Sequence, residues 1–107
     1  MAISDKHIAD IKKYDKSINM KLAQALYRRL AGAMARRDAA LVSFTDTKEL
    51  SRVRDGFIKK TLGVEDRKKA DAALEAVHTM MKKDKSRSRL TVYYLLAQEL
   101  RKANKVT

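Results

Sequence analysis

Residues 88–102 place the strongest constraint on how this chain can fold. They read Ser88-Arg-Leu-Thr-Val-Tyr-Tyr-Leu-Leu-Ala-Gln-Glu-Leu-Arg-Lys102. On a helix, one broad apolar stripe consists of Leu90, Tyr93, Tyr94, Ala97 and Leu100, while Val92 and Leu95 fall on the far side. A helix that is apolar nearly all the way round has to be surrounded by other elements. The sequence therefore predicts a largely buried C-terminal helix.

The remainder of the chain contains few residues that interrupt helices. Proline is absent, and the only glycines are Gly32, Gly56 and Gly63. The 107 residues, 45% of them hydrophobic, suffice for one core. We therefore expect an all-α fold, a compact single-domain bundle of about five helices over residues 1–107, with residues 1–16 as a loosely packed N-terminal helix.

Capping signals set the expected helix boundaries. In addition to the C-terminal helix, the expected helices cover residues 4–15, 17–36, 45–63 and 64–82. Ser4 can cap the first, Ser17 or Asn19 the second, and Thr45 or Asp46 the third. Glu49 stands where a reciprocal cap would use it. Gly63 is expected to end the third helix as a left-handed cap.

Two local features are less regular. Residues 39–44, after a possible cap at Asp38, could form a helical turn or a buried extended piece, and we expect a turn because no second strand is visible for pairing. Gly56 lies inside an expected helix, where glycine costs up to about 1 kcal/mol relative to alanine. No structural reason for that glycine can be read from the sequence.

The most unusual feature of the composition is its excess of positive charge. The chain has 25 Lys and Arg against 13 Asp and Glu, a net charge of +12. Such an excess attracts polyanions, and it also keeps a small domain soluble. Arg28, Arg29, Arg36 and Arg37 are expected to form an ordinary solvated helix face. The densest cluster is Lys82-Lys-Asp-Lys-Ser-Arg-Ser-Arg89.

This cluster is a candidate anion-binding site. The candidate residues are Lys85, Ser86, Arg87, Ser88 and Arg89, which precede or open the C-terminal helix. Free amides at a helix N-terminus, capping serines and flanking arginines together suit a phosphate or carboxylate. The simpler alternative is a solvated loop in which Arg89 pairs with a nearby acid such as Asp84 or Glu99.

Signatures of catalysis are missing from the sequence. There is no cysteine, His7 and His78 stand alone, and no glycine-rich phosphate loop occurs. Asp71 and Glu75 share a helix face, but it lies opposite the expected core. We therefore expect no enzyme, with no catalytic residue, cofactor, metal site or small-molecule substrate. No apolar run or leader pattern suggests a membrane, so we expect a cytoplasmic protein.

Two segments carry a resemblance to a known family. They are Glu49-Leu-Ser-Arg-Val-Arg-Asp-Gly-Phe-Ile-Lys-Lys-Thr-Leu-Gly-Val64 and Lys85-Ser-Arg-Ser-Arg-Leu-Thr-Val-Tyr-Tyr-Leu-Leu-Ala97. With them, residues 38–100 resemble a family of small bacterial proteins catalogued as domain of unknown function 2853. The resemblance implies a compact, helical, bacterial, cytoplasmic protein. It implies no activity and no functional residues.

Two functions remain open on the sequence. The first is a non-enzymatic helical interaction module that binds an acidic protein partner or associates with itself. The alternative is a nucleic-acid-associated protein that binds phosphate through residues 82–89 with little sequence preference. No membrane partner is expected.

Overall fold

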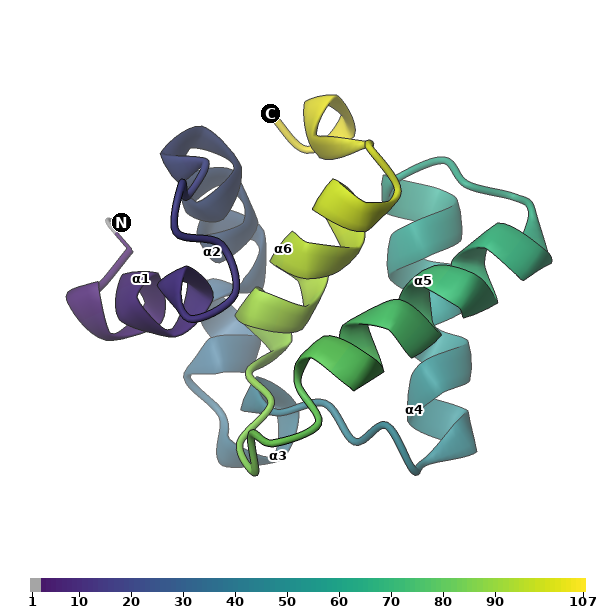
Figure 1. Ribbon diagram of the computed structural model, residues 1–107, viewed down its shortest axis with the longest axis horizontal. Helices are drawn as coiled ribbons and strands as arrows, with labels where there is room; N and C mark the ends of the chain where they lie inside the picture. The colour runs from purple at the N-terminus through teal and green to yellow at the C-terminus, as the bar shows by residue number, and fades with distance from the viewer. Residues whose placement is uncertain (1–2) are drawn as a thin grey trace.

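The computed structural model describes residues 3–107, apart from the side chains of residues 37 and 38. Helix α6 (Arg89–Glu99) runs through its middle, with α1 (Asp5–Lys12) and α2 (Met20–Met34) on one side and α4 (Thr47–Arg52) and α5 (Arg67–Met80) on the other (Figure 1). Its buried residues are Leu90, Thr91, Val92, Tyr94, Leu95, Leu96 and Ala97. The prediction of a largely buried C-terminal helix is confirmed.

The fold is all-α, as predicted. Helix α4 continues directly into a π-helix, η1 (Val53–Thr61), and the chain also forms a single turn, α3 (Arg37–Ala40), and a short 3-10 helix, η2 (Ala103–Lys105). Counting α4 and η1 as one, five helices are longer than a single turn among the described residues. The radius of gyration of 12.6 Å matches the roughly 13 Å expected for a compact chain of this length. No helix within residues 3–107 is long and apolar enough to cross a bilayer.

Aspartate and asparagine side chains start three of the helices. Asn19 accepts a hydrogen bond from an amide of α2, Asp46 accepts from two amides of α4, and Asp66 does the same for α5. These caps satisfy amides that have no partner within the helix. Ser4 occupies the cap position of α1, but its side chain makes no capping hydrogen bond.

The predicted helical turn over residues 39–44 is wrong beyond Ala40. Leu41 forms an isolated antiparallel bridge with Ser88, and the Val42 amide donates to the Arg87 carbonyl at 2.8 Å. Val42 and Phe44 are buried. The extended alternative prevails because residues 87–88, outside any strand, supply the backbone partner that the sequence did not reveal.

The glycines of the third predicted helix behave differently from each other. Gly63 has φ of +73°, which confirms the left-handed cap. Gly56 lies within η1 and has no positive φ. Among the described residues, Glu49 makes no reciprocal cap, and its carboxylate instead binds Arg89 of α6.

Candidate functional site

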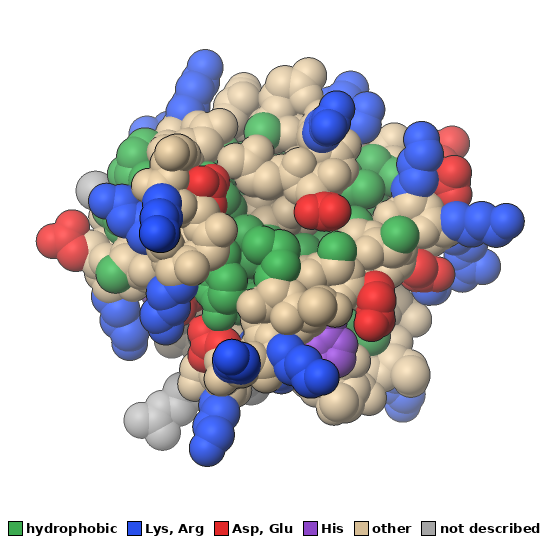
Figure 2. Space-filling model, in the orientation of Figure 1, with side chains coloured by type: hydrophobic (Ala, Val, Ile, Leu, Met, Phe, Trp, Pro, Cys, Tyr) green, Lys and Arg blue, Asp and Glu red, His purple; other side chains and the backbone are tan. Residues whose placement is uncertain are grey.

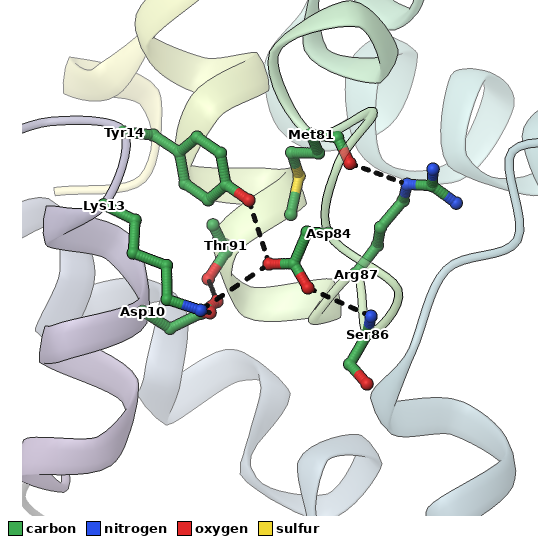
Figure 3. Close-up of polar contacts among 8 residues, drawn as sticks. All are labelled: Asp10, Lys13, Tyr14, Met81, Asp84, Ser86, Arg87 and Thr91. Carbon is green, nitrogen blue, oxygen red and sulfur yellow. Dashed lines mark hydrogen bonds and ion pairs between the residues drawn. The ribbon is translucent and has the colours of Figure 1, made fainter.

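The predicted anion-binding residues lie together on the basic connector, defined as residues 82–89, which leads from α5 into α6. The carboxylate of Asp84 organises this segment (Figure 3). It accepts hydrogen bonds from the Ser86 amide at 3.0 Å and from the Tyr14 hydroxyl at 2.9 Å, and the Lys13 ammonium lies 3.8 Å away. Asp84 thus fastens the connector to the end of α1.

These contacts set the protonation of the pair. Burial opposes ionisation of Asp84, but hydrogen bonds from Tyr14 and Ser86 and the charges of Lys13 and Arg87 lower its pKa overall. Burial and the hydrogen bond to Asp84 raise the pKa of Tyr14 to about 12. At neutral pH the carboxylate is therefore charged, and the phenol is its neutral donor.

Arg87 is committed to the C-terminal end of α5. Its guanidinium donates to the carbonyls of Met81 at 3.1 Å and Lys82 at 3.3 Å, and it lies 5.8 Å from the centroid of the Phe44 ring. A cation at this end of a helix satisfies carbonyls that have no helical partner and complements the dipole. Arg87 therefore has a structural role that accounts for its charge.

Arg89 is also committed within the chain. Its guanidinium binds the Glu49 carboxylate and donates to the Ala39 carbonyl at 2.6 Å and the Tyr93 hydroxyl at 3.1 Å. The side chains of Arg89 and Glu49 are only 12% and 14% exposed. Binding an external anion through this guanidinium would require breaking a partly buried ion pair.

The acid that pairs with Arg89 differs from both candidates proposed from sequence. Asp84 bonds to Tyr14 and Ser86, and Glu99 is exposed at the other end of α6. Glu49 was considered only as a cap for its own helix. Arg89 therefore does pair with an acid of its own chain, as the solvated-loop alternative predicted, but the acid is Glu49.

The remaining candidates differ in accessibility. The side chains of Lys85 and Ser86 are exposed. Ser88 occupies the cap position of α6 without a side-chain capping bond, and its buried hydroxyl has no hydrogen-bond partner within the described part of the chain. Nearby, Asp10 accepts a hydrogen bond from Thr91 in the first turn of α6. One of the chain's own carboxylates thus already lies beside the positive end of this helix.

A groove of about 560 Å³ separates α1 from the connector. Its walls include Lys6, His7, Asp10, Lys13, Asp84, Ser86 and Ser88. Burial, followed by the charge of Lys6, lowers the pKa of His7, so this histidine is neutral at pH 7. Two lysines thus face two carboxylates, and the groove does not select for anions.

Acidic and basic side chains are used differently across the fold. Several acids cap helices or bind buried groups, namely Asp10, Asp15, Asp46, Glu49, Asp66 and Asp84. Among the Lys and Arg side chains that the structure describes, only Lys13, Arg54 and Arg89 form ion pairs. Arg87 binds backbone carbonyls instead, most of the other cations are exposed, and on the face in Figure 2 the cations are spread around the periphery.

Sequence reasoning missed a second basic location. Arg29 of α2 and Arg52 of α4 line one hollow of about 290 Å³. Its other lining residues are Leu26, Leu30, Gly56, Phe57, Thr61 and Tyr93. Arg29 was assigned to a solvated helix face, and Arg52 was not singled out. The unexplained Gly56 was the one sequence signal that could have pointed here.

Comparison with known proteins places the chain in a family. A family described as protein of unknown function (DUF2853) matches residues 6–104. The chain belongs to this family. The comparison with curated proteins finds no significant match.

The DUF2853 match extends the resemblance noted for residues 38–100. It runs from α1 through α6 and therefore includes both the basic connector and the hollow beside Arg29 and Arg52. Membership in DUF2853 assigns no role to any residue of either location.

Proposed function

We propose that this protein is a non-enzymatic interaction module that binds an acidic segment of a partner protein. The proposal rests on the different use of acidic and basic side chains in the fold. Among the described residues, most Lys and Arg side chains form no ion pair, while several of the acids cap helices or bind other groups of the fold. The net charge of +12 would speed encounter with an acidic partner and discourage pairing of two identical copies.

Aromatic burial favours a protein partner over single-stranded nucleic acid. All four tyrosines and both phenylalanines are buried or half-buried. Proteins that bind single strands without sequence preference stack bases on accessible aromatic rings. Without exposed rings for stacking, nucleic acid would bind this chain chiefly through its cations.

Nucleic-acid association is the second candidate, supported by the sequence pI of about 10.1. Binding of this kind would rest on phosphate contacts and counterion release. Its affinity would fall steeply with salt and would not depend on sequence. Exposed Lys82, Lys83 and Lys85 of the connector are available for it.

A binding titration distinguishes the two candidates. Fluorescently labelled oligoglutamate, oligolysine and duplex DNA are titrated with the protein at low and at physiological ionic strength. We expect oligoglutamate to bind, oligolysine to remain free, and binding to weaken as salt rises. Failure to bind oligoglutamate at low salt rejects the proposal, and retention of duplex DNA in that case favours the second candidate.

A further inference from the structure

The hollow between α2 and η1 has an apolar floor. The rings of Phe57 and Tyr93 stack there with centroids 4.0 Å apart and an angle of 16°, and Leu26 and Leu30 of α2 form a wall. Its volume of about 290 Å³ lies at the low end for ligand pockets. The space suits one side chain of a partner better than a whole small molecule.

Gly56 lines this hollow. A Cβ at this position would meet nothing within 4 Å, and the backbone has no positive φ, so neither packing nor conformation requires glycine. The residue nevertheless lies inside a helical segment, where glycine is unfavourable by up to about 1 kcal/mol. The surrounding nine-residue segment is π-helical, and single-turn π-bulges within α-helices are frequent at functional sites.

The rim of the hollow is positively charged. Arg29 and Arg52 are exposed, and neither has an ion pair or a side-chain hydrogen bond with any residue the structure describes. No acidic residue is among the described residues that line the hollow. The adjoining hollow at Arg52 differs, because Asp46 and Glu49 line it as well. The two arginines therefore present unbalanced charge beside an apolar floor.

We infer that this hollow receives an apolar side chain of the partner, and that Arg29 and Arg52 bind carboxylates on either side of that residue. This inference rests on the proposed function and specifies the partner segment: a leucine-like residue within an acidic stretch. The planar guanidinium groups can each bind a carboxylate through two parallel hydrogen bonds. Burial of the apolar side chain would add affinity that an acidic stretch alone lacks.

The experiment compares two labelled peptides of equal length and charge, oligoglutamate with a central serine and the same peptide with a central leucine. We expect the natural protein to bind the leucine peptide about five- to tenfold more tightly. Gly56→Leu, which places a side chain at the hollow, should remove this preference, so that the two peptides bind with equal affinity. Gly56→Ala should reduce the preference by a smaller factor.

Charge reversal supplies the matched control. The pair Arg29→Glu and Arg52→Glu should weaken binding of both peptides and abolish the leucine preference. The pair Arg67→Glu and Lys68→Glu makes the same change in charge at exposed positions of α5 and should keep the preference. Helix content, measured by circular dichroism, confirms that each variant is folded.

Every outcome bears on the inference. Equal binding of the two peptides by the natural protein overturns it and leaves the proposed function standing. Retention of the preference in folded Gly56→Leu also overturns it. If that variant fails to fold, an undiminished preference in Gly56→Ala has the same meaning. If neither peptide binds at low salt, the proposed function itself is rejected.

Discussion

The hydroxyl of Tyr14 donates a hydrogen bond of 2.9 Å to the carboxylate of Asp84, a residue 70 positions further along the chain. This bond ties the segment after α1 to the connector before α6. Asp84 also accepts from the Ser86 amide and so holds the connector's own backbone in place. One acid thereby joins the N-terminal helix to the entrance of the central helix.

Removing the Tyr14 hydroxyl should lower the free energy of unfolding by an amount that depends on pH. We expect Tyr14→Phe to reduce the free energy of unfolding by about 1–2 kcal/mol at neutral pH, because a hydrogen bond to a charged acceptor is lost. The pKa of Tyr14 is raised to about 12 in the folded protein. Its contribution is therefore complete below the unfolded pKa of about 10 and is lost as pH rises through about 12.

Urea denaturation of both proteins at neutral pH and across the alkaline range measures this difference. Tyr27→Phe is the control, because the Tyr27 hydroxyl has no hydrogen-bond partner within residues 3–107. A Tyr14→Phe variant as stable as the Tyr27→Phe control at neutral pH would contradict the prediction.

The contributions of Glu49 and Arg89 to the free energy of unfolding should be strongly coupled. Glu49→Gln leaves a partly buried guanidinium without its carboxylate, and we expect a loss of about 2–4 kcal/mol in the free energy of unfolding. A double-mutant cycle with Arg89→Met should give a coupling energy of about 1–3 kcal/mol. Asp71→Asn removes a carboxylate that is 58% exposed and paired with Arg54, and it should cost about 1 kcal/mol or less. Similar costs for the two acids would show that burial does not strengthen the pair.

The hydroxyl of Tyr94 should contribute more than that of Tyr14. Tyr94 is fully buried, donates to Asp15 at 2.5 Å and accepts from the Asn19 amide at 2.8 Å. Tyr94→Phe leaves these groups without their partner, and we expect it to cost about 2–3 kcal/mol. Hydrogen exchange at the Asn19 amide should accelerate by more than the global loss of stability explains. Unchanged exchange at this amide would argue against the bond.

Two glycines should respond in opposite directions to the same substitution. Gly63→Ala forces alanine into φ of +73° and should destabilise the protein by about 1–2 kcal/mol. Gly56→Ala adds a methyl group to a helical position with free space and should raise stability by up to about 1 kcal/mol. Thermal unfolding of both variants checks the signs. Destabilisation by Gly56→Ala would show that the π-helical segment itself requires glycine.

The helices could be predicted from sequence because their signals are local. The apolar residues around α6 and the capping side chains of Asn19 and Asp46 lie within a few positions of the structure they specify. The left-handed cap at Gly63 follows from the same short-range logic. Helical periodicity and capping need no knowledge of the tertiary fold.

The candidate sites were harder to predict because they depend on distant partners. Arg89 meets Glu49 from 40 positions away, and the backbone partner of Val42 is Arg87. Neither contact can be read from helix or strand periodicity, because its two partners lie far apart in the sequence. The hollow beside Arg29 likewise forms only when α2 packs next to η1. The odd glycine at position 56 was visible, but its surroundings were not.

The central position of α6 also has a consequence for biosynthesis. Residues 89–99 leave the ribosome after every helix they join together, so the nascent chain through α5 carries apolar surfaces that have nothing yet to cover them. Such intermediates attract chaperones and one another. Completion of the core must therefore await translation of this late segment.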